Sequence, residues 1–290
     1  MLNETLLAIN QSQPLNIVLT STTNWSQYAV SIVLGSLGIL FYLYLMIKSG
    51  SFSLNLFSLA GISRLTKKSV LMIKHTEQGF FSQSMINEES LREISNILNK
   101  FEGRDFDLIL HTPGGDVFST LAISRLFNQY PGKIRGIIPL YAMSGGSMLA
   151  LTCDEILMTK NASIGPIDPQ LGSFFKYGSS KSWNEIVKFK GKKAEDQTIS
   201  FAMTGKQYTQ TIKAHLLNVI DFNLSSEQKE KLTQFLTAGD IEHAYALTPM
   251  DLEKFGMKVT ILEDKKLLKM LEKIISSRTC EGINCHLRKN

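Results

Sequence analysis

The sequence is poor in cysteine and proline and carries little net charge. Its 290 residues include three Cys and seven Pro, and the formal charge is +5. An odd number of cysteines in a chain this long does not make a disulfide scaffold. Seven prolines and 20 glycines are too few for a collagen-like or Pro/Gly-rich disordered chain. Without a dense run of Lys and Arg, the small charge gives nucleic-acid binding no support.

Charge is unevenly placed along the chain. Between Glu4 and Lys48 there is no charged residue, and the second half of that gap, 28–47, is almost entirely apolar. About 20 apolar residues are what an α-helix needs to cross a bilayer. A cleaved signal peptide is disfavoured because no positively charged region precedes the run. We therefore expect a transmembrane helix at 28–47 rather than a buried core helix.

The flanks of this run predict its orientation. Residues 1–28 contain no Lys or Arg, whereas Lys48, Arg64, Lys67 and Lys68 follow it. The positive-inside rule then places the short N-terminus, 1–27, outside the cytoplasm and the bulk of the chain inside. The prediction is a single-pass membrane protein that contacts membrane lipid and has its main domain in the cytoplasm.

The rest of the chain alternates short apolar strands with amphipathic helices. Strands are expected at 69–74, 106–111, 133–140, 155–159 and 257–262, with helices near 87–101, 116–129, 145–153, 207–221 and 226–237. Such alternation indicates right-handed βαβ units and a mostly parallel sheet, an α/β fold. Between 176 and 206 the pattern gives way to a polar, lysine-rich stretch.

These patterns divide the chain after the membrane run into three parts. We expect a linker at 48–65, an α/β domain at 66–263, and an amphipathic helix with a tail at 264–290. The basic helix at 264–277 either packs on its own domain or a neighbouring subunit, or lies on anionic lipid. The tail motif CEGINCH at 280–286 lacks a second pair of ligands, so no metal site is predicted.

Two glycine-rich segments make unusual backbone demands. HTPGGD at 111–116 lies between an expected strand and helix, where glycines let the backbone approach a ligand closely. In YAMSGGS, Ser144 directly precedes Gly-Gly at the start of an apolar helix. A serine there is either a helix N-cap or a nucleophile beside helix amides.

Three motifs together resemble one enzyme family. DLILHTPGGDV, YAMSGGSMLALTCDEI and ASIGPIDPQLG, in this order, resemble the Clp-fold serine peptidases. The resemblance is greatest to the membrane-tethered serine dehydrogenase proteinase family, a distant relative of ClpP and of signal peptide peptidase SppA. It covers about residues 66–262 and implies a ClpP/crotonase-like fold. Crotonases share this fold, so the fold alone does not decide the reaction.

The resemblance assigns roles to named residues. Ser144 matches the nucleophile, and Gly115 and Gly145 match the residues whose backbone N–H groups form the oxyanion hole. Ser147 is an alternative nucleophile. Where the ClpP pattern has histidine this chain has Asp168, and near the ClpP aspartate it has His243. The two residue types are thus interchanged, with His243 as the base and Asp168 as its partner.

A lysine base is the alternative. The SppA branch uses a serine–lysine dyad whose lysine follows the serine by roughly 40–50 residues, and this zone contains Lys188, Lys190, Lys192 and Lys193. We carry Lys192 and Lys193 as the alternative base. A lysine becomes a base when burial removes its charge.

The resemblance implies a membrane-anchored serine endopeptidase that hydrolyses peptide or protein substrates, without a metal or other cofactor. Rings are common among the proteins it resembles, so a homo-oligomer is expected. Two other functions remain open. One is a catalytically inactive membrane scaffold, and the other is a crotonase-like acyl-CoA enzyme.

Overall fold

The computed structural model describes residues 32–41, 54–75, 77–78, 82–83, 85–173, 176–277 and 282–288. The chain forms two compact units, Met1–Phe52 and Ser53–Asn290. In the first unit, residues 32–41 are helical; the remainder of the expected span at 28–47, and all of 1–27, lie outside the described residues. None of the helices in the described part is long and apolar enough to cross a membrane.

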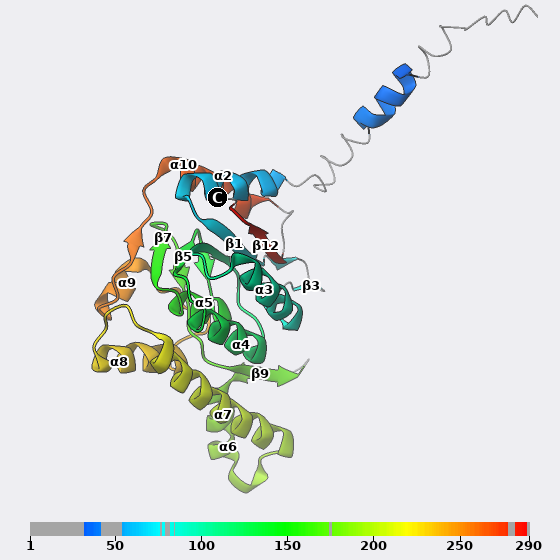
Figure 1. Cartoon of the computed structure of the whole chain (residues 1–290). Coiled ribbons are helices and arrows are strands. Elements are labelled where there is room, and N and C mark those ends of the chain that lie inside the picture. The colour runs from blue at the N-terminus through cyan, green and yellow to red at the C-terminus, as the bar shows by residue number, and fades with distance from the viewer. Residues whose placement is uncertain are drawn as a thin grey trace, which may run out of the picture. The chain divides into compact units, whose positions relative to one another are not determined.

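A six-stranded sheet forms the centre of the second unit (Figure 1). The strands, in spatial order, are β11 (Thr260–Ile261), β7 (Glu155–Met158), β5 (Ile134–Ile138), β4 (Phe106–His111), β1 (Ser69–Lys74) and β12 (Gly282–His286). Neighbours are parallel except β12, which runs antiparallel to β1. Every residue of β1 and β4 is buried, as expected for parallel strands that are covered on both faces. The predicted α/β fold with a mostly parallel sheet is therefore confirmed.

Helices cover the two faces of the sheet. On one side lie α3 (Glu88–Phe101), α4 (Val117–Asn128) and α5 (Gly145–Leu151), and on the other α2 (Leu54–Thr66) and α10 (Lys265–Ser276), as Figure 1 shows. Alternate residues of β4 serve the two cores. Leu108 belongs to the first core and Ile109 to the second, because successive side chains of a strand point to opposite faces.

The structure adds detail to the two ends of the expected domain and replaces part of the linker by a helix. Residues 54–66 are not linker: they form α2, which buries Leu59 and Ile62 in the same core as Leu271 of α10. The basic amphipathic helix thus packs on its own domain. Within the expected helix and tail at 264–290, residues 282–286 form β12, which pairs with the edge of β1 and satisfies backbone groups that an edge strand leaves open.

The stretch after Gln170 contains more structure than its polar composition indicates. The hairpin β9 (Gln170–Ser173) and β10 (Lys176–Ser179) leads into α6 (Ser180–Lys190) and a 3-10 turn, Gly191–Lys193. The long helix α7 (Asp196–Val219) begins well before the expected start near 207 and is followed by α8 (Ser226–Thr237) and α9 (Pro249–Lys254).

Four short strands complete the described fold. β2 (Glu77–Gln78) pairs with β3 (Ser82–Gln83), and β6 (Tyr141–Ala142) pairs with β8 (Ser163–Ile164). The second pair matters for the site, because β6 leads directly into Ser144 and β8 leads into Asp168. It therefore fixes two candidate residues with respect to each other.

Candidate active site

Ser144 occupies a strained backbone position at the N-terminus of α5. Its φ and ψ are 50° and −116°, a conformation that costs a non-glycine residue on the order of 1–3 kcal/mol. Its side chain makes no capping hydrogen bond to the helix, so the N-cap role that the sequence left open is not adopted. Instead Ser144 lines a cavity of about 580 Å³ between α4, α5, α7 and the β9–β10 hairpin.

Two backbone N–H groups near Ser144, those of Gly115 and Gly145, donate no hydrogen bond within the described residues. The Ile86 N–H donates to the Gly114 carbonyl at 2.9 Å, and the Ile86 carbonyl accepts from the Asp116 N–H at 3.0 Å. The N–H of Gly115, the residue between these two partners, takes part in neither bond. Within the described residues, neither the Gly115 nor the Gly145 N–H has an acceptor. The two residues line the same cavity as Ser144, and such paired free donors suit a developing oxyanion.

Glycine is required around these amides. A Cβ atom on Gly114, whose φ is 115°, would lie 2.8 Å from the Gly145 nitrogen and 2.9 Å from Ser144 Cβ. One on Gly115 would overlap the Ile86 carbonyl, and one on Gly145 would come within 2.7 Å of Thr120 Oγ1. The glycines therefore allow the 112–115 loop to contact the start of α5 directly.

Asp168 and His243 meet at the other side of the cavity, although 75 residues separate them. His243 Nδ1 and Asp168 Oδ1 are 2.7 Å apart, and Gln170 Nε2 donates to Asp168 Oδ2 at 2.6 Å. Asp168 is 3% exposed, whereas the His243 side chain is 33% exposed. An ionised carboxylate only accepts hydrogen bonds, so Nδ1 of a neutral His243 carries the proton and Nε2 keeps its lone pair.

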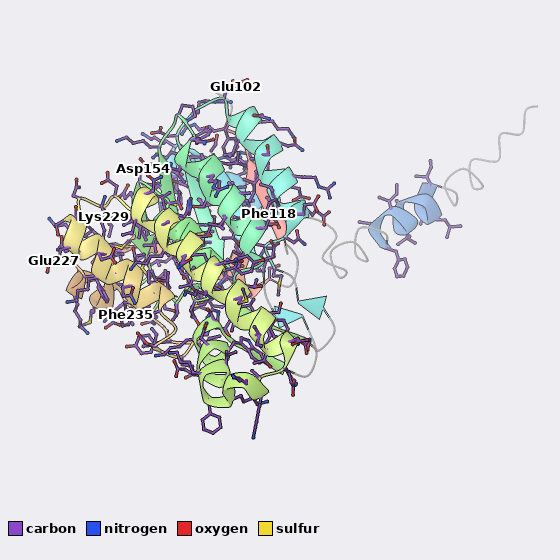
Figure 2. The ribbon with its side chains drawn as sticks, turned by 90° about the horizontal axis from the view of Figure 1, so that it is seen from below. Glu102, Phe118, Asp154, Glu227, Lys229 and Phe235 are labelled. Atoms are coloured by element: carbon purple, nitrogen blue, oxygen red, sulfur yellow. The ribbon has the colours of Figure 1, made fainter. Side chains whose placement is uncertain are left out.

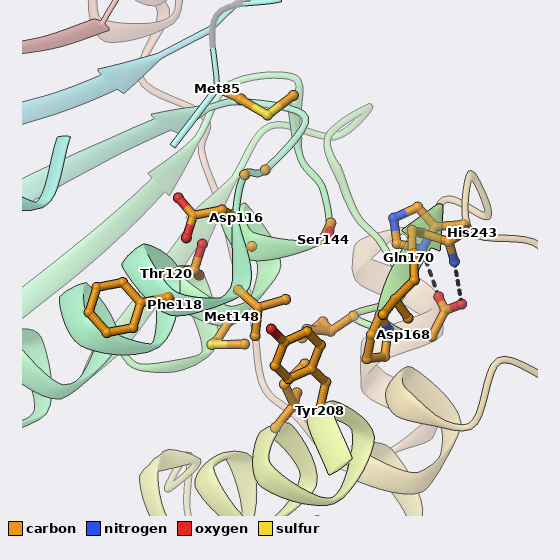
Figure 3. A pocket seen from close by; sticks show the side chains of 18 of the residues that line it. Met85, Asp116, Phe118, Thr120, Ser144, Met148, Asp168, Gln170, Tyr208 and His243 are labelled. Carbon is orange, nitrogen blue, oxygen red and sulfur yellow. Dashed lines mark hydrogen bonds and ion pairs between the residues drawn. The ribbon is translucent and has the colours of Figure 1, made fainter. Parts of the chain in front are cut away.

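His243 lines the same cavity as Ser144, but no hydrogen bond connects the two side chains in the described residues. Dashed lines in Figure 3 connect Asp168 with His243 and Gln170, and none reaches Ser144. In the described part of the chain, Ser144 Oγ has no hydrogen bond to the imidazole. Catalytic hydrogen bonds are often long or absent before substrate binds.

The alternative residues are placed less favourably. Ser147 is fully buried and both donates to the Ala142 carbonyl at 2.7 Å and accepts from the Gly165 amide at 2.8 Å, so its hydroxyl is structural. Lys192 and Lys193 are exposed in the 3-10 turn, and neither lines the cavity. The alternative lysine base therefore lacks both burial and proximity to Ser144. Lys188 and Lys190 form ion pairs with Glu185 and Glu195.

A polar chain fixes α7, which forms one wall of the cavity. Thr152 Oγ1 donates to the Met148 carbonyl at 2.8 Å and lies 2.6 Å from Ser124 Oγ, which lies 2.7 Å from His215 Nε2. Because Thr152 uses its hydrogen on Met148, Ser124 donates to Thr152 and His215 donates to Ser124. Burial, and then the charge of Arg125, lower the pKa of His215, so this link is made by a neutral imidazole at pH 7.

A family model for ClpP-like SDH-type serine proteinases matches residues 30–279, which is most of the chain. The chain belongs to this family. It is therefore a serine protease with a ClpP-like α/β fold, as the motifs predicted. The match settles the class of enzyme.

Two relatives come from Methanocaldococcus jannaschii. Uncharacterized protein MJ0137 is 29% identical over 73% of this chain and 75% of its own length. Uncharacterized protein MJ1495 is 34% identical over 59% of this chain and 57% of its own length. Among solved structures, a mutant of the 1510-N membrane-bound stomatin-specific protease is similar at a TM-score of 0.44 and 18% identity, over 64% of this chain and 79% of that one. This last likeness is too distant to carry an argument.

Two features of the site escaped sequence reasoning. Gln170, which holds the second oxygen of Asp168, stands two residues after it in GPIDPQ, yet nothing in the motif shows that the side chain turns back. The contribution of Phe201 on α7 was missed because the polar stretch before 207 concealed the start of the helix.

We predict that Gly115→Ala lowers kcat by about 10²–10³-fold, because the new methyl group displaces the loop whose amide faces the cavity. The measurement is peptide hydrolysis by the purified full chain. Gly178→Ala is the matched control, since a methyl group there makes ordinary contacts at 3.6 Å or more. Equal activity of the Gly115 variant and the wild type would contradict the assigned amide.

Proposed function

We propose that the chain is a membrane-anchored endopeptidase in which Ser144 is the nucleophile, His243 the base and Asp168 the residue that orients His243. The observation that carries this proposal is the Ser144 hydroxyl in one cavity with two unused amides and with an Asp168–His243 pair. The family supplies the reaction class, and the cavity supplies groups of the right chemistry for it.

In the proposed reaction, Ser144 Oγ attacks the scissile carbonyl carbon as its proton passes to His243 Nε2. The carbonyl electron pair moves onto the oxygen, which the Gly115 and Gly145 N–H groups stabilise. Collapse of this intermediate breaks the C–N bond, and the imidazolium gives its proton to the departing amine. Water, deprotonated by His243, then cleaves the acyl-enzyme and restores Ser144.

This mechanism requires a closing movement of the imidazole toward Ser144. The His243 side chain is one-third exposed and belongs to a segment without regular secondary structure between α8 and α9. Asp168 is the fixed point of the pair, since it is buried and held by Gln170. A bound peptide that covers the cavity would favour the closed arrangement by excluding water.

Labelling with a fluorophosphonate probe tests the assigned residues. We expect the full chain in detergent to be labelled, and Ser144→Ala to lose all labelling. His243→Ala and Asp168→Asn should reduce the labelling rate by about 10³–10⁴-fold, since an unassisted serine is a poor nucleophile. The matched control is Lys192→Ala with Lys193→Ala, which should label as the wild type does. Loss of labelling in the lysine variant, with retention in His243→Ala, would favour the dyad and contradict this assignment.

We also propose that the run at 28–47 anchors the enzyme in a membrane, with its catalytic domain on the cytoplasmic side. The uncharged sequence and the Lys and Arg residues that follow it support this. A homo-oligomer is part of the same proposal. Exposed apolar side chains on α6 and α7, Phe189 at 93% and Met203 at 61%, support it. Mass photometry measures the mass of the assembly directly, and detection of the monomer alone would contradict the homo-oligomer.

For the anchor, we predict that Leu34→Arg with Leu37→Arg releases the chain from carbonate-washed membranes. A central arginine costs roughly 2.5–3.5 kcal/mol on an insertion scale, so two remove most of the drive for insertion. Leu65→Arg, on the exposed side of α2, is the control and should stay in the membrane pellet. An unchanged pellet for the double variant would contradict the anchor.

A further inference from the structure

The charges that line the cavity are of one sign. Among its lining residues are two carboxylates, Asp116 and Asp168, and neither Lys nor Arg is present in the described lining. The whole chain, in contrast, carries a formal charge of +5. His243 is the one lining side chain that can become cationic, and it is already paired with Asp168.

The lysines next to the cavity do not offset this charge. Lys176, which precedes the lining residue Tyr177, pairs with Glu195 at 2.8 Å. Lys181, on the first turn of α6, pairs with Asp240. Both lysines thus pair with carboxylates that lie outside the cavity lining, and Glu195 is shared with Lys190.

Asp116 is the carboxylate that remains available to a substrate. One oxygen, Oδ1, accepts from the Ser119 amide at 2.8 Å and caps α4, while Oδ2 has no hydrogen bond within the described chain. The side chain is exposed and directly follows Gly115, whose amide faces Ser144. On the same first turn of α4, the Phe118 ring is 72% exposed at the surface (Figure 2). Asp116 and Phe118 therefore offer a cation and its alkyl stem both a charge and an apolar surface.

Two further observations mark this cavity as a place for a polar ligand. Thr120 is 1% exposed and lines the cavity, yet its Oγ1 has no hydrogen-bond partner in the described residues, an arrangement that folding alone does not favour. The Tyr177 side chain is largely exposed, but desolvation of its phenol, and then the Asp168 carboxylate, raise its pKa. The second effect is the response expected of a phenol in a negative environment.

We propose that this cavity selects peptides with a Lys or Arg side chain close to the scissile bond and discriminates against peptides with Asp or Glu there, with Asp116 as the residue that sets the preference. The inference rests on the proposed function, since it concerns substrates of the same site. A cleft lined by one sign of charge concentrates ligands of the opposite sign. An acidic side chain placed there meets an unpaired carboxylate instead.

The preference has a consequence for the rate of bond cleavage. The carboxylate of Asp116 adjoins the amide that stabilises the oxyanion, and like charges repel. A cationic side chain of the substrate beside Asp116 offsets that repulsion as negative charge develops on the carbonyl oxygen. The charge preference should therefore appear in kcat as well as in KM.

The test begins with a peptide library digested by the full chain in detergent, with Ser144→Ala as the blank. One cleaved peptide is then made in three forms, with Lys, Gln or Glu at the position nearest the cleaved bond that shows enrichment. The variant is Asp116→Asn, because asparagine is as good an N-cap as aspartate and α4 is kept. Asp264→Asn is the matched control: Asp264 also caps a helix, α10, and lies outside the cavity.

We expect kcat/KM for the Lys peptide to exceed that for the Glu peptide by about tenfold at low salt in the wild type and in Asp264→Asn. In Asp116→Asn the ratio should fall by about three- to fivefold, and 0.5 M NaCl should reduce it in the wild type. Cleavage without a charge preference, or an unchanged ratio in Asp116→Asn, would overturn the inference and leave the proposed function intact. Absence of both cleavage and Ser144 labelling would overturn both.

Discussion

The backbone of Ser144 is the constraint on which the rest of the site depends. A serine held at φ 50° cannot relax into the helix that follows, so its hydroxyl stays in the cavity rather than capping α5. The conformation persists because of three contacts around it. The preceding strand β6 pairs with β8, Gly146 donates to the Met143 carbonyl at 2.7 Å, and the Gly114 loop packs against Ser144. These contacts thus offset the conformational strain of the Ser144 backbone.

The same architecture explains why residues far apart in sequence meet there. Parallel strands direct their following loops to one edge of a sheet, and both the 112–115 loop after β4 and Ser144 after β5 and β6 are delivered in this way. Asp168 and His243 come from outside the sheet, on either side of α6, α7 and α8. These helices connect the two residues of the Asp168–His243 pair along the chain, and α7 lines the cavity.

Sequence patterns predicted the elements whose formation depends mainly on residues that are close together in the chain. The strands β1 and β4 followed from buried apolar runs, and the helix expected near 87–101 is α3, capped by Asn87. The helix α2 was missed because Leu59 and Ile62 become core residues only in the tertiary structure, where they pack with α10, some 200 residues away, and with the central sheet. For the site, the resemblance pointed to Ser144, Gly115 and Gly145 and paired Asp168 with His243, a pair that the structure joins by a hydrogen bond. The contact of Gln170 with Asp168 depends on the tertiary structure, and residue spacing does not predict it.

The proposed mechanism is tested most directly by a structure of the full chain with a phosphonate bound covalently. It predicts a bond from phosphorus to Ser144 Oγ, with the phosphoryl oxygen about 3 Å from the Gly115 and Gly145 nitrogens. It also predicts that His243 Nε2 moves to within about 3 Å of Ser144 Oγ while Nδ1 keeps its bond to Asp168. An adduct on another serine, or an imidazole that stays away from Ser144 when the cavity is filled, would contradict it.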